Sequence, residues 1–592
     1  MPQQIRRSQF VLTYGPGAIL ESTDGPRIIL DPWIGLFGQQ IAGRTVSPDL
    51  YEINHQRMSQ GLLNGTRIFR LPSNAELNLS EKKYIYRTKP FPEWALCVDH
   101  NILYRLQTGC PRCTFRKGRR EAIRFVRACP EGHLDDVDWD FVVHRGSVKT
   151  CRSNWYHWER NGSALRDINI RCPICKKVAN LGDAYQRSWP CSGRFPEREH
   201  DYTPMRPGCN NQQGSRIIQR QASNLRLPEI VSLFTIPPRH TALHRLLENT
   251  AISSILVVSP PATYEELQAM LETLLNRRMI SRTTADEILR YPWPEIQKAI
   301  KDIQTPIPTS FRDLLLEEFH ELINASVFGV SAIRDSKLLF EVIKDNVYCC
   351  RSSSGRLFRI APVSRLNTVI VQLGYRRLIG SVPEAAALVD ISFRDQNQNK
   401  WLPGVEFLGE GVFIMLDENE GWHFPMSGEA FLRWLDVYYN RSGDYNDILF
   451  RFPEQKDELH PVFVWWHTLA HLLIRTLAVN SGYSSSSIRE RIYLEIDQSG
   501  RARGGILLYT VQPGADGTLG GLVSIIRHFG SILTSIKEEA EKCSNNPLCE
   551  EQKFTFGNCI GAACYGCILV SETSCEHRNM WLDRHILTEN QP

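Results

Sequence analysis

The chain has 592 residues, of which 42% are hydrophobic and 23% are charged. These fractions are ordinary for globular proteins and exclude a chain that is disordered along its whole length. Sixty-nine Lys and Arg residues against 65 Asp and Glu residues leave a net charge of +4, so nucleic-acid binding would need a local basic patch. The sequence lacks both an uninterrupted apolar run of about 18 residues and an N-terminal signal-peptide pattern, so we expect a cytoplasmic protein without a membrane span.

The pattern of residues along the chain predicts an α+β multidomain protein. Short β-like runs come first, helical spacing dominates the middle, and mixed strand and helix signals follow. Within the middle, helices are expected over 263–279, with Thr263 and Glu266 as a capping box, and over 309–324. We expect five segments: a β-rich segment (1–100), a loop-rich cysteine segment (101–215), a helical region (216–345), a mixed α/β region (346–457) and a C-terminal cysteine-containing domain (458–592).

One long apolar segment, 461–479, is nearly long enough to cross a bilayer. His467, His471 and Arg475 recur in it at every fourth residue, which places three polar groups on one helix face. This pattern favours a buried helix with a polar stripe. A metalloprotease helix would need a glutamate directly after the first histidine, where Thr468 stands. Strands are expected after this helix, over 491–497 and 504–512.

Cysteine is the most informative residue type in the sequence. Fifteen of the 17 cysteines fall in two blocks, 97–209 and 543–575. Disulfides are rare in cytosolic proteins, and clustered CxxC pairs there more often bind a metal. The two blocks therefore predict metal sites.

The first block contains candidates for two zinc sites. Zinc takes four nitrogen or sulfur ligands, and a CxxC turn supplies two of them. The spacing predicts one site from Cys110, Cys113, Cys129 and His133. It predicts a second site from Cys172, Cys175, Cys191 and Cys209, with Cys151 as an alternative ligand. We therefore expect the N-terminal region to be irregular and zinc-stabilised.

The second block predicts a third metal site. It holds six cysteines, which are too many for one zinc ion, and the favoured four ligands are Cys549, Cys564, Cys567 and Cys575. Cys543 lies nearby in sequence, whereas Cys559 is expected to pack among apolar residues. Zinc is the first interpretation, and an iron–sulfur cluster is the alternative because four thiolates suit either. Sites closed by four protein ligands hold the fold together and do not catalyse.

Two further segments are candidates for phosphate contact. The run 116–127 is basic and lies between the two halves of the first predicted site; its candidate residues are Arg116, Lys117, Arg119, Arg120 and Arg124. The glycine-rich run 513–521 precedes a helix, and Asp516 and Thr518 are its candidates. A solvated charged face and a tight turn are the respective alternatives. The sequence has no P-loop, and no positioned base identifies a serine nucleophile, so we assign no catalytic residue.

The chain resembles the DrmB family of the DISARM bacterial anti-phage system. The resemblance rests on RRSQFVLTYGPGAIL (6–20), ACPEGHLDDVDW (128–139) and CIGAACYGCILVSETSCEHRNMWLDRHIL (559–587). The last 130 or so residues also resemble the C-terminal domain of MrfA-type DNA repair helicases, through WHTLAHLLIR (466–475), IRERIYLEI (488–496) and GADGTLGGLV (514–523).

The resemblance implies a subunit that is not itself an enzyme. DrmB-like proteins lack a motor and pair with DrmA, an SNF2-like helicase, to engage incoming phage DNA, while a methyltransferase of the same system marks self DNA. The related domain of MrfA-type helicases carries a four-cysteine metal site, which supports the third predicted site. The cysteine spacing predicts two or three structural zinc sites in all, and the lack of a P-loop predicts that this chain binds no nucleotide. The alternatives are a stand-alone DNA-binding sensor and a nuclease or hydrolase with an unrecognised site.

Overall fold

The computed structural model covers residues 1–592 and divides into two compact units. The structure describes 4–592 except for 33–39, 42–43, 80–84, 114–118, 146–150, 152, 202, 237–241, 305–306, 335–336, 378–385, 392, 396, 418–425, 442–452, 513–519, 556–558 and 572. The first unit contains 1–54, 65–232 and 370–405, and the second contains 55–64, 233–369 and 406–592. Each unit is therefore assembled from segments far apart in sequence, and the five-segment division stays a prediction.

Most strands of the first unit form small antiparallel sheets, whereas three of its strands join the 11-stranded sheet. Its elements are α1 (Arg7–Leu12), β1 (Ile19–Ser22), β2 (Gly25–Ile29), β3 (Gln40–Ile41), β4 (Arg44–Thr45), β5 (Arg67–Arg70), β6 (Thr88–Pro90), β7 (Trp94–Cys97), β8 (Ile102–Arg105), β9 (Arg120–Ala122), β10 (Phe125–Ala128), β11 (Leu134–Asp136), α2 (Trp139–His144), β12 (Trp155–Arg160), β13 (Ile168–Arg171), β14 (Val178–Asn180), α3 (Leu181–Gln186), β15 (Ser188–Trp189), β16 (Ser215–Gln219), β22 (Val389–Asp390) and β23 (Phe393–Arg394).

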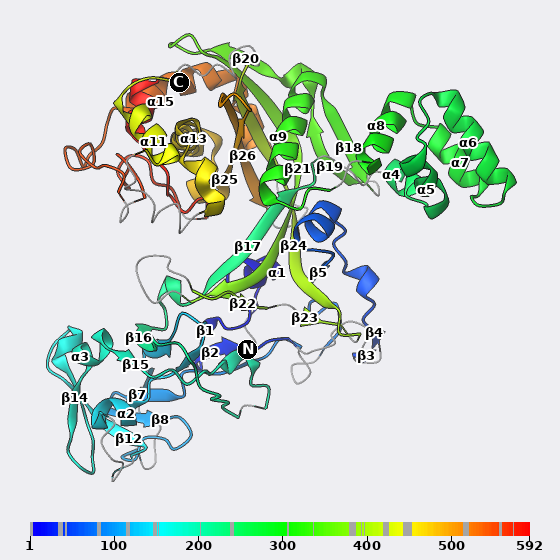
Figure 1. Ribbon diagram of the computed structural model, residues 1–592. Helices are drawn as coiled ribbons and strands as arrows, with labels where there is room; N and C mark the ends of the chain where they lie inside the picture. The colour runs from blue at the N-terminus through cyan, green and yellow to red at the C-terminus, as the bar shows by residue number, and fades with distance from the viewer. Residues whose placement is uncertain are drawn as a thin grey trace. The chain divides into compact units, whose positions relative to one another are not determined.

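Two of these sheets position the cysteines of the first block. One has the strand order β14-β13-β12-β8-β7-β9, and the other has the order β11-β10-β16-β15. β7 and β8 form a hairpin in the first sheet, with Cys97 opposite Ile102. In the second sheet, both β15 and β10 pair with β16, so residues distant in sequence meet there. β15 and β16 lie side by side in Figure 1.

The second unit is built around one large sheet. Its elements are α4 (Ala242–Leu247), α5 (Thr250–Val258), α6 (Tyr264–Asn276), α7 (Arg282–Leu289), α8 (Trp293–Gln304), α9 (Phe311–Phe328), β18 (Val330–Arg334), β19 (Lys337–Val342), β20 (Tyr348–Arg351), α11 (Glu429–Tyr439), α13 (Pro461–Ser481), β25 (Ile488–Ile496), β26 (Ala502–Gln512), α14 (Gly521–Ser524), α15 (Phe529–Ala540) and α16 (Arg584–Glu589). The strands β17 (Leu227–Phe234), β21 (Leu357–Arg376) and β24 (Lys400–Leu416) carry residues of both units.

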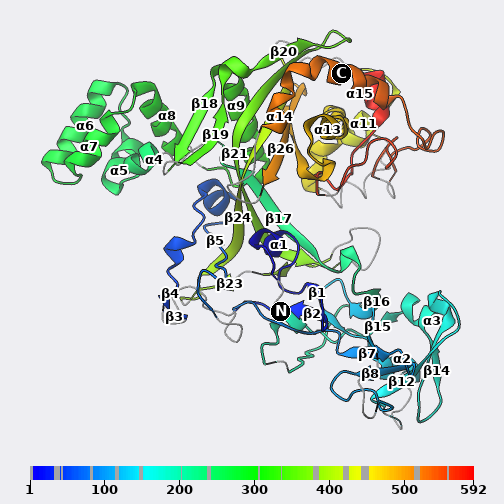
Figure 2. The same cartoon turned by 180° about the vertical axis from the view of Figure 1, so that it is seen from behind.

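Helices cover both faces of the β25–β26 hairpin, which lies at one end of the strand order β18-β19-β21-β24-β26-β25. On one face Ile492 and Ile506 join the apolar core that contains α13. On the other face Tyr493 and Leu507 pack with Phe319 of α9. Helices α13 and α9 lie on opposite sides of the hairpin in Figures 1 and 2. Burial on both faces explains why β26 has a nearly continuous apolar sequence.

Helix α13 is a core helix of the second unit. It is the single helix among the described residues with the length and composition to cross a membrane, and 78% of its most apolar window is buried inside the protein. His467 and His471 are fully buried on it. The prediction of a buried helix with polar groups is confirmed, as are the strands that follow it.

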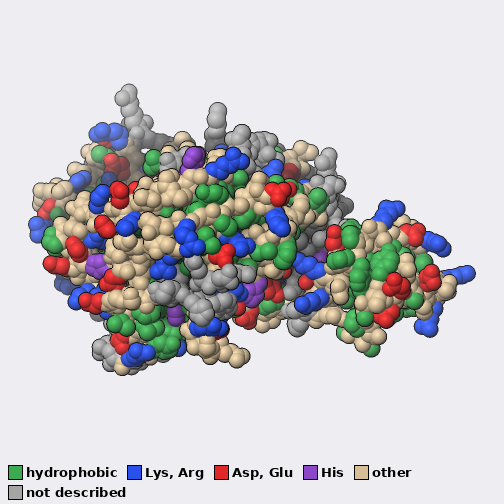
Figure 3. All heavy atoms as spheres, turned by 90° about the horizontal axis from the view of Figure 1, so that it is seen from above, with side chains coloured by type: hydrophobic (Ala, Val, Ile, Leu, Met, Phe, Trp, Pro, Cys, Tyr) green, Lys and Arg blue, Asp and Glu red, His purple; other side chains and the backbone are tan. Residues whose placement is uncertain are grey.

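The helices α4–α8 form a group with their own apolar core. Half of the predicted capping box is present at the start of α6, because Thr263 Oγ1 accepts a hydrogen bond from the N–H of Glu266 at 3.3 Å. The Glu266 carboxylate accepts from the N–H of Ala262 at 2.7 Å and not from that of Thr263. In Figure 3 the outer surface of this group, at the right of the view, mixes apolar side chains with charges of both signs. The predicted α+β multidomain fold with a helical middle is confirmed.

Candidate metal centres

Among the described residues, five groups of Cys, His or Glu bring four ligand atoms within 4.8 Å of one another. Three groups belong to the first unit and two to the second. We name the first four centres A to D: A is Cys97, His100, Cys110 and Cys113; B is Cys129, His133, Cys191 and Cys209; C is His144, Cys151, Cys172 and Cys175; D is Cys543, Cys549, Cys564 and Cys567.

Centre A lies on the β7–β8 hairpin. Cys97 ends β7, and His100 lies in the turn before β8. The Cys110–Cys113 turn follows β8 and returns to the same place, so that the Sγ atoms of Cys97 and Cys113 are 3.7 Å apart. His100 Nδ1 lies 3.4 Å from Cys113 Sγ and 3.6 Å from Cys110 Sγ. Three thiols and one imidazole therefore converge on one point, a donor set that zinc prefers.

Centre B gathers residues around the sheet that contains β10 and β15. Cys129 follows β10, and its Sγ lies 3.2 Å from His133 Nδ1. Cys191 follows β15, and a hydrogen bond from the Cys129 thiol is the largest of the effects that lower the pKa of Cys191 to about 4. Gly193 has a φ of +72°, and a Cβ atom there would meet the carbonyl oxygen of Gly208 at 2.0 Å. Glycine thus permits the close approach of the two loops that carry Cys191 and Cys209.

Centre C lies beside helix α2. His144 ends this helix, and its Nε2 is 3.2 Å from Cys175 Sγ. Its Nδ1 lies 2.8 Å from the carbonyl oxygen of Asp140, an arrangement that leaves Nε2 to face the cysteines. The Sγ atoms of Cys151 and Cys172 are 3.4 Å apart. A hydrogen bond from the backbone N–H of Lys177 is the largest contribution that lowers the pKa of Cys175, to about 7.

Centre D follows helix α15 and consists of four cysteines. The Sγ atoms of Cys543 and Cys564 are 3.4 Å apart, and the Cys564–Cys567 and Cys549–Cys567 pairs are both 3.7 Å apart. Burial raises the pKa of Cys564, but hydrogen bonds from the neighbouring thiols outweigh it and lower the value to about 6. Burial raises the pKa of Cys549 and Cys567, so Cys564 becomes a thiolate more readily than either of these two.

The structure groups several residues differently from the sequence prediction. Cys110 and Cys113 lie with Cys97 and His100, and not with Cys129 and His133. The reason is sheet topology, because β8 and β10 belong to different sheets.

The other two predicted sites are also regrouped. Cys191 and Cys209 join Cys129 in centre B, because β15 and β10 flank the same strand, β16. Cys172 and Cys175 lie with Cys151, the alternative ligand, and with His144. In the C-terminal block Cys543 takes the place predicted for Cys575. The sequence reasoning did not select Cys97, His100 and His144; the Cys97-x2-His100 spacing was the available signal for the first two.

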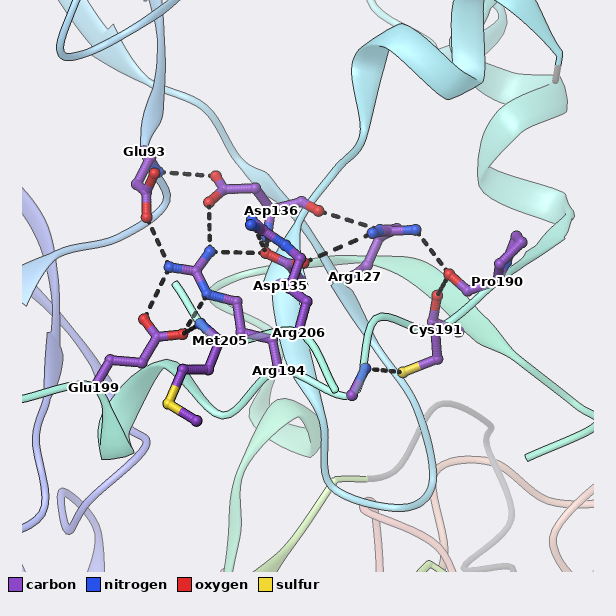
Figure 4. A network of polar contacts seen from close by, with 12 residues as sticks. Glu93, Arg127, Asp135, Asp136, Pro190, Cys191, Arg194, Glu199, Met205 and Arg206 are labelled. Atoms are coloured by element: carbon purple, nitrogen blue, oxygen red, sulfur yellow. Dashed lines mark hydrogen bonds and ion pairs between the residues drawn. The ribbon is translucent and has the colours of Figure 1, made fainter. Parts of the chain in front are cut away.

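A buried ion network supports the loop of centre B (Figure 4). Arg194, three residues after Cys191, is fully buried and contacts four carboxylates. Its guanidinium donates to Glu199 at 2.9 Å, to Asp135 and Glu93 at 2.7 Å each, and to Asp136 at 3.4 Å. Lys89 and Arg206 balance further charge by pairing with Glu199 and Asp135. This network ties the Cys191 loop to β11 and to the segment before β7.

The predicted phosphate-contact residues are only partly described. Arg116, Lys117, Asp516 and Thr518 lie outside the described residues. Arg119 contacts Asp99 through Nε at 3.0 Å, and Arg120 donates to the carbonyl oxygen of Asp24 at 2.6 Å. Arg124 is exposed between β9 and β10.

Comparison with known proteins gives matches at both ends of the chain. Residues 6–227 match a family model described as a domain of unknown function (DUF8724), and residues 469–568 match the MrfA Zn-binding domain. The DISARM protein DrmB of Bacillus paralicheniformis (strain ATCC 9945a / NCIMB 11709 / CD-2) is 28% identical over 531 residues, which cover 84% of this chain and 88% of the relative. The predicted resemblance to DrmB is confirmed.

A solved structure of a helicase also matches part of the chain. It is the crystal structure of the DUF1998 helicase MrfA bound to DNA, at 11% identity and a TM-score of 0.17, over 38% of this chain and 27% of that chain. All four cysteines of centre D lie within the residues that match the MrfA Zn-binding domain. This match and the Cys/His clusters support zinc sites in this chain.

Proposed function

We propose that this chain is a non-catalytic, zinc-binding subunit of a DISARM defence system, in which it pairs with an SNF2-like helicase of the DrmA type to engage foreign DNA in the cytoplasm. The observation that carries the proposal is the similarity to DrmB along most of both chains. The match to the MrfA Zn-binding domain also supports a role beside a helicase, because this domain is named after the helicase MrfA. The sequence itself lacks a P-loop, so the motor belongs to the partner.

The geometry of centres A to D fits single zinc ions. Sulfur ligands about 2.3 Å from a tetrahedral ion lie roughly 3.8 Å from one another. The sulfur–sulfur hydrogen-bond distances in centres A, C and D run from 3.4 to 3.7 Å. An iron–sulfur cluster places several iron atoms between its cysteines and would spread them further, so we assign zinc to centre D as well.

Each of the four centres already has four protein ligands, which leaves no open coordination position for a substrate. We therefore assign the ions a structural role, in which each one fixes a loop-rich surface. The basic run 116–127 lies directly after the Cys110–Cys113 turn of centre A. A zinc-fixed turn would hold its exposed arginines in place for contact with DNA phosphates.

Reconstitution with the helicase tests this proposal. The chain, the DrmA-type helicase encoded beside it, and their mixture are each assayed for ATP hydrolysis with and without DNA. We expect no ATPase from the chain alone and a change in the DNA-stimulated rate or DNA affinity of the helicase when the chain is added. Tight DNA binding or DNA cleavage by the chain alone, with no effect on the helicase, would favour the stand-alone sensor or the nuclease.

A further inference from the structure

The fifth group of ligand atoms lies deep in the second unit. His467 and His471 are one turn apart on α13, Glu490 is on β25, and Cys575 comes from the C-terminal segment. His467 Nε2 lies 2.9 Å from Glu490 Oε1 and 3.3 Å from Cys575 Sγ. His471 Nε2 lies 3.1 Å from the same carboxylate oxygen. All four residues are buried.

The protonation of His471 makes this group unusual. Its Nδ1 lies 3.1 Å from the carbonyl oxygen of Ile568, which can only accept a hydrogen bond, so Nδ1 carries the proton. In the neutral ring Nε2 then has a lone pair, and this lone pair faces a carboxylate oxygen. Two acceptors at this distance repel each other unless a cation lies between them. A second proton or a metal ion would meet that requirement.

Among the described residues, two neighbouring cations, Arg491 and His577, are paired with other carboxylates, and His577 Nδ1 lies 3.0 Å from Glu458. The neighbouring Arg491 is committed elsewhere, since it donates to Glu318 at 2.9 Å and to Glu576 at 2.8 Å. Glu490 Oε2 is buried without a hydrogen-bond partner. A buried carboxylate oxygen without a hydrogen-bond partner is energetically unfavourable, so its persistence in a packed core indicates a missing partner.

Cys575 has the backbone environment of a metal-bound thiolate. Its Sγ accepts hydrogen bonds from the N–H groups of His577 and Asn579, each at 3.3 Å. The same pattern, an N–H two residues after the cysteine, occurs at Cys543 of centre D and at Cys191 of centre B, both at 3.4 Å. This recurrence links Cys575 to the cysteines of the zinc centres.

We propose that His467, His471, Glu490 and Cys575 bind a further zinc ion, separate from that of centre D. Two neutral imidazoles, one carboxylate and one thiolate balance the charge of Zn²⁺, so the occupied site is neutral and its burial costs less than that of the bare anions. The ion joins α13, β25 and the C-terminal segment. Four protein ligands and full burial make its role structural.

Metal counting on the full chain tests this site. Native mass spectrometry of the purified protein, with element analysis, gives the number of zinc ions per chain. We expect Cys575→Ser and His471→Gln each to retain one zinc ion fewer than wild type. Cys349→Ser is the matched control, because Cys349 is an exposed cysteine outside the five groups, and it should retain the wild-type number. Folded variants of Cys575 and His471 with unchanged zinc would overturn the proposal.

A second measurement does not depend on the folding of a variant. Anomalous diffraction from crystals of the wild-type chain, recorded above and below the zinc absorption edge, locates each ion directly. We expect a peak between His467 and Glu490 in addition to the peak at centre D. A peak at centre D with none between these two residues would refute the fifth site while leaving the proposed function intact.

Discussion

Replacement of Arg194 by methionine tests the buried ion network beside centre B. The arginine is fully buried and contacts Glu93, Asp135, Asp136 and Glu199. Methionine has a similar length but no charge, so the variant leaves these carboxylates without their shared cation. Removing one partner of a buried ion pair typically costs about 3–5 kcal/mol, and four carboxylates share this partner. We expect a loss at or above that range.

The loss converts into a measurable shift of the melting temperature. Domains of about 150–250 residues lose roughly 2–4 °C per kcal/mol, so the transition of the first unit should fall by about 6–20 °C. Differential scanning calorimetry of the zinc-loaded chain measures this shift. The Arg194→Lys variant keeps the charge but lacks the forked set of donors, so its melting temperature should lie between those of wild type and Arg194→Met.

A surface arginine provides the matched control. Arg198 is 47% exposed and lies 3.9 Å from Asp31. Exposed pairs of this kind contribute about 1 kcal/mol or less, so Arg198→Met should shift the transition by only a few degrees. If Arg194→Met shifted the transition no more than Arg198→Met, the network would not be the support of the Cys191 loop that the structure indicates.

Three further predictions address the metal centres, the pH dependence and the DNA surface. The double variant Cys97→Ser/Cys110→Ser should lose one zinc ion by native mass spectrometry and Cys110→Ser/Cys129→Ser should lose two; the loss of only one ion from the second variant would restore the grouping predicted from sequence. Burial and the charges of Asp135 and Glu93 raise the pKa of Asp136 from 3.8 to about 7. Between about pH 4 and 7 the folded chain therefore holds a proton that the unfolded chain has released, and this contribution to stability is lost as the pH rises through that range. Asp136→Asn should flatten that decline in thermal melts, and an unchanged slope would contradict the assignment. Replacing Arg119, Arg120 and Arg124 by glutamine should weaken DNA binding by the helicase complex at low salt and reduce the salt dependence of its affinity. An unchanged affinity and an unchanged salt dependence would remove this surface from the proposal.

The sequence predicted the local parts of the metal centres well and their assembly poorly. Cys110-x2-Cys113 and Cys564-x2-Cys567 are turns whose two thiols must face one point, and the structure keeps each pair together. The partner of the first pair depends on which sheet each strand joins. Cys97 and His100 reach it because β7 and β8 pair directly, whereas Cys129 follows a strand of another sheet. Strand pairing of this kind is a long-range property that ligand spacing does not encode.

The helix with His467 and His471 shows the same limit in another form. Helical periodicity correctly placed the two imidazoles on one face of a buried helix. Of their partners, Glu490 lies on the strand that follows, 19 residues after His471, and Cys575 lies in a segment 108 residues after His467. From the sequence alone the pair was therefore interpreted as a polar stripe, because the spacing showed two ligands and not four.

Affinity purification of the tagged chain from its native host, with its genomic neighbours present, tests the central proposal most directly. Mass spectrometry identifies the proteins that elute with it, and DNA-stimulated ATPase is measured on the same fraction. The account predicts a stoichiometric SNF2-like helicase and an ATPase that the isolated chain lacks. A chain that elutes alone, with no helicase and no associated ATPase, would contradict the proposed role as a helicase subunit.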